Sequence, residues 1–132
     1  MEILWVEDNP GDEVLIRLAL SGASVPVNLH FARDGEQALR MIGRTGFRPS
    51  LIVLDLNIPR IPGPDLLQRW RGIDIPMVVF SSSRNSAERA LVLALGAREF
   101  VEKPTGIGPF TSAVSGIVQR WGEGSPEITC GA

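Results

Sequence analysis

The chain alternates between short apolar runs and longer segments with helical periodicity, and the alternation repeats five times. Such a pattern is typical of an α/β fold with a parallel sheet. The segments with strand character are Ile3–Val6, Val27–Phe31, Leu51–Leu54, Met77–Phe80 and Arg98–Glu102. We therefore expect five strands joined by helical connections.

The five runs differ in polarity, and this difference predicts their order. The first, third and fourth runs are continuously apolar, as expected of strands covered by helices on both sides. The second and fifth contain polar residues, which is typical of edge strands. With right-handed crossovers, the pattern predicts a doubly wound, flavodoxin-like parallel sheet in the order 2-1-3-4-5, with helices on both faces.

Helix signals between the strands indicate one domain over residues 1–121, followed by a short C-terminal tail over 122–132. Asn9 is placed to cap the first helix, with Pro10 at its first position and Asp12 in its first turn. Val14, Leu15, Leu18 and Ala19 predict an apolar stripe on this helix, and Phe110, Ala113, Val114, Ile117 and Trp121 predict one on the last helix.

Composition narrows the functional classes. With 132 residues and a net charge of −2, the chain lacks the basic excess of a nonspecific nucleic-acid binder. It shows no signal peptide and no apolar run long enough for a membrane span, so a cytoplasmic protein without membrane partners is expected. Its single cysteine, Cys130, excludes an intrachain disulfide. Among 13 Lys and Arg residues, Lys103 is the only lysine.

Polar residues follow four of the predicted strands. Glu7 and Asp8 follow the first strand, Asp55 the third, Ser81 the fourth and Lys103 the fifth. Ligands of open α/β sheets bind at the carboxyl ends of the strands, where the strand order reverses. We therefore expect these side chains to form one site between the first and third strands.

The grouped carboxylates favour a divalent cation, because they would otherwise repel one another. Oxygen ligands with positions left for water suit Mg²⁺, and we expect it on Asp8, Asp55 and the backbone carbonyl of Asn57, with Glu7 nearby or acting through water. The set predicts phosphoryl transfer with Asp55 as the nucleophile. Lys103 and Ser81 would then bind phosphoryl oxygens.

At these residues the chain resembles the receiver domain of response regulators. The resemblance rests on four segments, Val6–Pro10, Leu54–Pro59, Phe80–Ser83 and Gly96–Pro104, in the family's order, and it extends from Glu2 to about Trp121. It implies that Asp55 accepts a phosphoryl group from a sensor histidine kinase, with Mg²⁺ as cofactor. It also implies that Ser81 and Phe100 form a switch pair, and that the Lys103–Pro104 peptide is a candidate for the cis isomer.

Among receivers, the opening from Glu7 to Asp12 and the Asp55–Pro59 loop look most like the single-domain response regulators associated with bacterial phytochromes. Three positions depart from the commoner receiver pattern. Ser81 stands where Thr is usual, Phe100 where Tyr is frequent, and Pro62 where an acidic residue usually precedes the glycine. None of these changes removes a group that the phosphoryl chemistry needs.

The same residues disfavour other functional classes. Two carboxylates after the first strand would repel a flavin phosphate, and Asn57 stands where a phosphatase of the haloacid dehalogenase type has a second aspartate. An enzyme in the ordinary sense is not expected, since self-phosphorylation from phosphohistidine and slow autodephosphorylation are the only catalysis implied. A receiver-like module that binds constitutively, without phosphate turnover, stays the alternative.

The expected output is protein contact, because no output domain follows the last helix of the chain. The segment Ala90–Leu95 is apolar on all sides, more than one helix face can bury against its own sheet. We therefore expect a homodimer through the fourth and fifth helices, with a surface that includes Leu91, Val92, Leu95 and Trp121. The downstream protein is not identified by the sequence.

Overall fold

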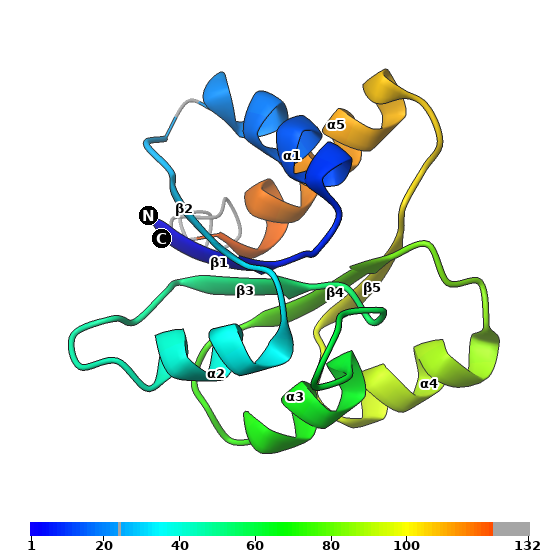
Figure 1. Cartoon of the computed structure of the whole chain (residues 1–132). Helices are drawn as coiled ribbons and strands as arrows, with labels where there is room; N and C mark the ends of the chain where they lie inside the picture. Colours follow the sequence, from blue (N-terminus) through cyan, green and yellow to red (C-terminus); the bar gives the residue numbers. More distant parts are fainter. Residues whose placement is uncertain (24, 123–132) are drawn as a thin grey trace, which may run out of the picture.

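Five parallel strands form one sheet in the order β2-β1-β3-β4-β5 in the computed structural model, which describes residues 1–23 and 25–122 (Figure 1). The strands are β1 Glu2–Val6, β2 Asn28–Ala32, β3 Leu51–Leu54, β4 Met77–Ser81 and β5 Glu99–Glu102. The helices are α1 Pro10–Ser21, α2 Gly35–Ile42, α3 Gly63–Arg69, α4 Ser86–Ala94 and α5 Ile107–Trp121. The predicted fold class and strand order are confirmed.

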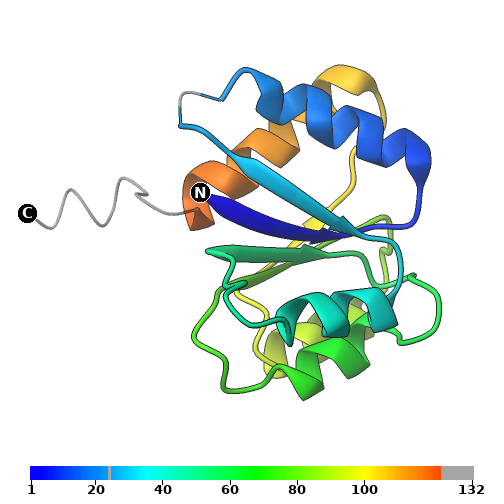
Figure 2. The ribbon, with the colours of Figure 1, turned by 60° about the vertical axis from the view of Figure 1, so that its left-hand side comes forward.

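Helices cover both faces of the sheet. Helices α1 and α5 lie on one face, and α2, α3 and α4 on the other (Figures 1 and 2). Alternate residues of the central strands therefore enter two separate cores. In β1, Leu4 and Val6 pack beneath α2, α3 and α4, whereas Ile3 and Trp5 pack against α1 and α5. This double burial explains why the central strands read as continuous apolar runs.

The strand boundaries differ from the expected ones by one residue at several ends. Strand β2 begins and ends one residue later than predicted, β5 begins one residue later, and β4 extends to Ser81. The extension of β4 follows from its pairing with β5, where Ser81 is opposite Glu102. Polar residues at strand ends give no apolar signal, so their pairing was not visible in the sequence.

Helix α1 begins where its capping residues predict. The side chain of Asn9 accepts hydrogen bonds from the backbone nitrogens of Gly11 and Asp12, and Pro10 is the first helical residue. The predicted apolar stripe is partly wrong, however, because Val14 and Leu18 are exposed. The helix instead buries Ile16 and Leu20, together with half-buried residues beside them.

Helix α4 corrects one residue of the expected dimer surface. Val92 is fully buried and belongs to the protein's own core, so its assignment to an interface is wrong. Leu91 and Leu93 are 47% and 41% exposed, and Leu95 is half-buried. Because the segment is apolar on every side, periodicity could not show which residue faces the sheet.

The C-terminal end of the chain is described only as far as Gly122. Helix α5 ends at Trp121, whose ring nitrogen donates a hydrogen bond to Glu99 of β5 at 2.8 Å. The expected tail over 122–132, including Cys130, otherwise lies outside the described residues. Within the described part, none of the helices has the length and apolarity needed to span a membrane.

Candidate functional site

Backbone hydrogen bonds fix the residues that follow three of the strands. The backbone nitrogen of Glu7 donates to the carbonyl of Ala32 at 2.9 Å, and that of Asp55 to the carbonyl of Val6 at 3.1 Å. The backbone nitrogen of Lys103 donates to the carbonyl of Ser81 at 2.8 Å. Because these bonds continue the sheet pairing, the sheet itself holds Glu7, Asp55 and Lys103 at its carboxyl edge.

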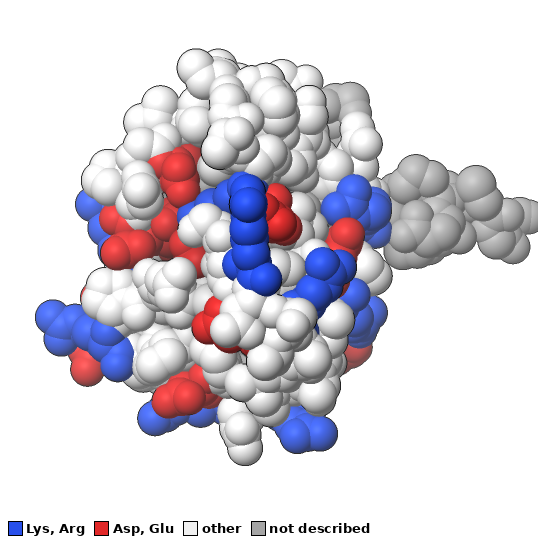
Figure 3. Space-filling view, turned by 90° about the vertical axis from the view of Figure 1, so that its right-hand side faces the viewer, with Lys and Arg blue, Asp and Glu red and all other residues white. Residues whose placement is uncertain are grey.

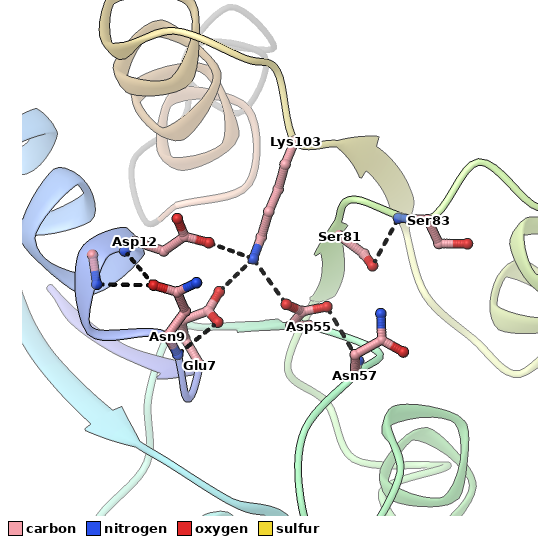
Figure 4. Close-up of polar contacts among 9 residues, drawn as sticks. Glu7, Asn9, Asp12, Asp55, Asn57, Ser81, Ser83 and Lys103 are labelled. Atoms are coloured by element: carbon pink, nitrogen blue, oxygen red, sulfur yellow. Dashed lines mark hydrogen bonds and ion pairs between the residues drawn. The ribbon is translucent and has the colours of Figure 1, made fainter.

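The side chain of Lys103 joins three carboxylates at this edge (Figure 4). Its Nζ donates to Glu7 Oε1 at 2.7 Å, to Asp12 Oδ2 at 2.7 Å and to Asp55 Oδ2 at 2.8 Å. An ammonium group has three protons, so each of them is directed at a different carboxylate. The Lys103 side chain is 10% exposed, which shields these ion pairs from bulk water.

Burial and charge act in opposite directions on the two most buried partners. Burial raises the pKa of Glu7, and the hydrogen bond and charge of Lys103 offset this only in part. Burial alone would lower the pKa of Lys103, but its hydrogen bonds to Asp12, Asp55 and Glu7 raise it well above the usual lysine value. Lys103 is therefore fully protonated at neutral pH.

A cleft of about 530 Å³ opens beside this ion-pair cluster. The polar residues that line it are Glu7, Asp8, Asn9, Asp12, Asp55, Asn57, Ser82, Lys103 and Thr105. Asp55 is only 6% exposed, and its Oδ1 accepts a hydrogen bond from the backbone nitrogen of Asn57 at 3.2 Å. The Asp55 carboxylate is thus held from two sides and still borders the cleft.

The loop after Asp55 is packed closely against neighbouring backbone. A Cβ atom on Gly63 would lie 2.9 Å from the Cα of Leu56 and 3.1 Å from the carbonyl oxygen of Asp55, so only glycine fits there. Arg60 adopts a φ of 74° and pairs with Asp34 and Glu36 next to α2. The C-terminal end of the loop that carries Asn57 therefore packs against Leu56 and pairs with residues at the start of α2.

The two residues expected as a switch pair are both buried. The Ser81 hydroxyl oxygen accepts a hydrogen bond from the backbone nitrogen of Ser83 at 3.3 Å. Phe100 belongs to the core beneath α4, where the guanidinium carbon of Arg89 lies 5.6 Å from its ring centroid. Neither residue is among those that line the cleft, whereas the neighbouring Ser82 is.

The Lys103–Pro104 peptide bond is trans, so the expectation of a cis bond is wrong. None of the peptide bonds among residues 1–23 and 25–122 is cis. The trans form is the one that X-Pro bonds ordinarily prefer, by about 0.5–1 kcal/mol.

The donor set of the cleft fits Mg²⁺. Four carboxylates, those of Glu7, Asp8, Asp12 and Asp55, line a cleft with one ammonium group, so negative charge is in excess. Among the described residues, no three acidic, His or Cys side chains lie close enough together to form a metal site by themselves, and Lys103 Nζ lies between Glu7, Asp12 and Asp55. Two carboxylates with water and a carbonyl are nonetheless a typical Mg²⁺ set.

Asp12 is the site residue that sequence reasoning missed. It was assigned only to the first turn of α1, whereas its carboxylate contacts Lys103 from the wall of the cleft. The signal was present in the capping motif. Because Asn9 and Pro10 fix where α1 starts, Asp12 must lie in the first turn of α1, beside the carboxyl end of β1.

Both signs of charge occur on the face of the molecule drawn in Figure 3. On the face shown in Figure 3, acidic and basic side chains are interspersed, and the described residues form no broad basic area there. Several of the arginines pair with acidic neighbours, for example Arg84 with Glu102 at 2.8 Å and Arg120 with Glu99 at 2.9 Å.

The fold and the site together define a flavodoxin-like α/β domain whose strand ends carry a held aspartate, further carboxylates and a lysine. Residues 3–115 match the family described as the response regulator receiver domain, and the chain belongs to that family. It is a receiver domain of two-component signalling, a class of phosphoacceptor proteins that bind Mg²⁺.

Curated relatives of similar sequence include the response regulator MprA. The protein from Mycobacterium leprae (strain TN) is 31% identical over 122 residues, which cover 91% of this chain and 52% of that protein. MprA of Mycobacterium tuberculosis (strain ATCC 25177 / H37Ra) is 30% identical over 122 residues, with 91% and 51% covered. The chain thus spans about half the length of these relatives.

Solved structures with the same fold include three response regulators. The phosphorylated cyanobacterial phytochrome response regulator RcpA is 31% identical with a TM-score of 0.86, covering 91% of this chain and 92% of that one. The Mn²⁺-bound form of response regulator Rcp1 is 29% identical with a TM-score of 0.85, covering 93% and 95%. Regulator RPA3017 in red light signaling of R. palustris is 25% identical with a TM-score of 0.80, covering 92% and 94%.

Proposed function

We propose that this receiver accepts a phosphoryl group on Asp55 from a sensor histidine kinase in the cytoplasm and signals by protein contact. The observation that carries the proposal is the placement of the Asp55 carboxylate. It follows a fully buried strand, borders an open cleft and receives a hydrogen bond from the Lys103 ammonium group at 2.8 Å. A carboxylate in this position is a competent nucleophile toward an activated phosphoryl group.

In the proposed step, a carboxylate oxygen of Asp55 attacks phosphorus while the phosphorus–nitrogen bond of phosphohistidine breaks. The electron pair of that bond stays on the histidine nitrogen, and Asp55 becomes an acyl phosphate. Lys103 supplies positive charge to a phosphoryl oxygen. Asp8, Asp55 and the carbonyl of Asn57 would hold Mg²⁺, with Glu7 nearby or acting through water. When bound, the cation neutralises charge on the phosphoryl oxygens.

Ser81 is suited to sense the new group. Its hydroxyl oxygen accepts a hydrogen bond from the Ser83 nitrogen, so its own proton can be donated to a phosphoryl oxygen. A shift of Ser81 toward Asp55 would weaken its bond to the β4–α4 connection. Phe100, packed beneath α4, is the proposed partner that transmits this change to the surface.

A phytochrome as the kinase is the finer part of the proposal. It is supported by the similarity to RcpA and RPA3017, whose names connect them with phytochrome and red-light signalling. The opening from Glu7 to Asp12 supports the same partner.

Replacing Asp55 by Asn tests the phosphoacceptor. Incubated with acetyl phosphate and Mg²⁺, the wild type should gain one phosphoryl group by intact-mass spectrometry, and D55N should gain none. Asp65→Asn is a matched control, because Asp65 is an exposed aspartate of α3. Equal incorporation by D55N and the wild type would move the acceptor to another residue. No incorporation by any form would favour a module that binds constitutively.

We also propose that two copies associate through α4 and α5. The proposal is supported by two exposed apolar residues of α4, Leu91 and Leu93. Leu95, which follows α4, and Trp121 at the end of α5 are both half-buried. Light scattering at micromolar concentration should give the mass of a dimer, and Leu91→Arg should give that of a monomer. The matched control Leu18→Arg places the same change on exposed α1 and should leave the dimer intact. A monomeric mass for the wild type at all concentrations would contradict the proposed dimer.

A further inference from the structure

Asp12 and Lys103 connect the start of α1 with the end of β5. The carboxylate of Asp12 accepts a hydrogen bond from Lys103 Nζ at 2.7 Å, as short as the bond from Lys103 to Glu7. Asp12 is 22% exposed at its side chain, so the contact is partly shielded from water. The residue stands outside the set of carboxylates that the proposed phosphoryl transfer uses.

The capping turn of α1 fixes the backbone of Asp12. Asn9 Oδ1 accepts from the nitrogens of Gly11 at 2.9 Å and Asp12 at 3.2 Å, and the preceding Pro10 has a restricted φ. The nitrogen of Asn9 in turn donates to Glu7 Oε2 at 3.2 Å. The two carboxylates that hold Lys103 besides Asp55 are therefore linked through the Asn9 cap, one just after β1 and the other in the first turn of α1.

Phosphorylation changes only one of the three bonds of Lys103. Formation of the acyl phosphate removes the negative charge of the Asp55 carboxylate, which weakens the bond from Lys103 Nζ to Asp55 Oδ2. The proton of that bond then becomes available to an oxygen of the phosphoryl group on Asp55. Glu7 and Asp12 keep their charges, so the ammonium group does not have to leave its place to meet the new ligand.

We propose that Asp12 is a positioning residue that, together with Glu7, anchors the Lys103 ammonium beside Asp55 before and after phosphoryl transfer. This inference rests on the proposed phosphorylation of Asp55. Lys103 touches the reacting group, and Asp12 acts through Lys103. Without Asp12, the ammonium group keeps two partners and gains a solvent contact, so its average position relative to the phosphoryl oxygens is less well defined.

The single lysine of the sequence allows a direct measurement of this anchoring. Protein labelled with ¹⁵N-lysine has one ammonium signal, and NMR relaxation of that signal reports the mobility of Lys103 Nζ in the unphosphorylated protein. We expect a rigid ammonium in the wild type, a mobile one in Asp12→Ala and an intermediate one in Asp12→Asn, whose amide oxygen accepts a hydrogen bond without charge. Mobility equal to wild type in Asp12→Ala would overturn the anchoring.

Glu13→Gln is the matched control, because it removes a negative charge from the same turn of α1 without touching Lys103. Glu13 pairs instead with Arg17 at 3.2 Å and Arg33 at 3.3 Å. In Glu13→Gln, the mobility of the Lys103 ammonium group should equal that of the wild type. Loss of ammonium order in this control as large as in Asp12→Ala would show a general effect of charge and overturn the specific role of Asp12.

The second measurement is the rate of phosphate incorporation from acetyl phosphate with Mg²⁺. We expect Asp12→Ala to lower the rate constant about tenfold, the effect of losing one charge-assisted hydrogen bond, with Asp12→Asn between it and the wild type. An unchanged rate in Asp12→Ala would overturn the role in the reaction. Failure of the wild type itself to incorporate phosphate would overturn the proposed function, while the ammonium mobility would still decide the anchoring.

Discussion

Replacing Lys103 by methionine should lower the free energy of unfolding by about 3 kcal/mol at pH 7, because it leaves buried carboxylates without their counterion. Glu7 and Asp55 are almost completely buried, and both receive hydrogen bonds from Lys103 Nζ. Methionine fills a similar volume, so the loss reports on charge more than on packing. Urea unfolding, monitored by circular dichroism, measures the loss of unfolding free energy.

The loss should shrink as the pH falls from 7 toward 5. Burial already raises the pKa of Glu7 in the wild type, and removal of the ammonium group raises it further. The folded variant then binds a proton at a pH where the unfolded chain does not, so acidification stabilises it. The wild type behaves differently at alkaline pH. Because the pKa of Lys103 is raised in the folded protein, its contribution to stability is complete below the ordinary lysine pKa. That contribution is lost only as the pH rises above the ordinary lysine pKa.

Arg84→Met is the control for this prediction. Arg84 is 81% exposed at its side chain and pairs with exposed Glu102, so its removal should cost less than about 1 kcal/mol. Equal losses in Lys103→Met and Arg84→Met would contradict a special role for the buried ammonium.

Lys103→Arg, in contrast, keeps the charge and should still impair the site. Arginine presents its donors in a planar fork, whereas the three acceptors of Lys103 surround a single nitrogen atom. We expect stability between that of wild type and Lys103→Met, with phosphate incorporation and partner response impaired more than by any other Lys/Arg exchange. Wild-type stability and incorporation in Lys103→Arg would show that charge alone suffices.

Replacing Phe80 by alanine should destabilise the fold by about 4 kcal/mol, because it opens a cavity in the core beneath the site. Phe80 is fully buried between two aromatic neighbours. Its ring centroid lies 6.1 Å from that of Trp5 and 5.2 Å from that of Phe110, both in edge-on arrangements. The Lys103 Nζ atom lies 5.9 Å from the same ring, so the cavity also removes a cation–π contact from the site.

The measurement is again urea unfolding, with Phe47→Ala as the matched control. Phe47 is half-buried and packs edge-on against His30 at the periphery of the fold, so its loss should cost only about 1–2 kcal/mol. Losses of the same size in the two variants would argue against close packing around Phe80.

The fold was predictable because its signals are local. Continuous apolar runs identify the central strands, polar alternation identifies the edge strands, and Asn9 with Pro10 places the start of α1. Errors arose where the local signal is ambiguous. The all-apolar run in α4 did not show that Val92 faces inward, and the α1 pattern did not separate exposed Val14 and Leu18 from buried Ile16.

The sequence by itself determined the sheet order and the residues at the strand ends, because the carboxyl ends of parallel strands share one edge. It could not determine which of those residues bond to one another. Only the tertiary structure decided that Lys103 directs its three protons at Glu7, Asp12 and Asp55. These partners lie 96, 91 and 48 residues away along the chain, and packing of α1 against the sheet brings Asp12 within reach. Hydrogen bonds over such separations depend on ångström-scale placement, which no local pattern encodes.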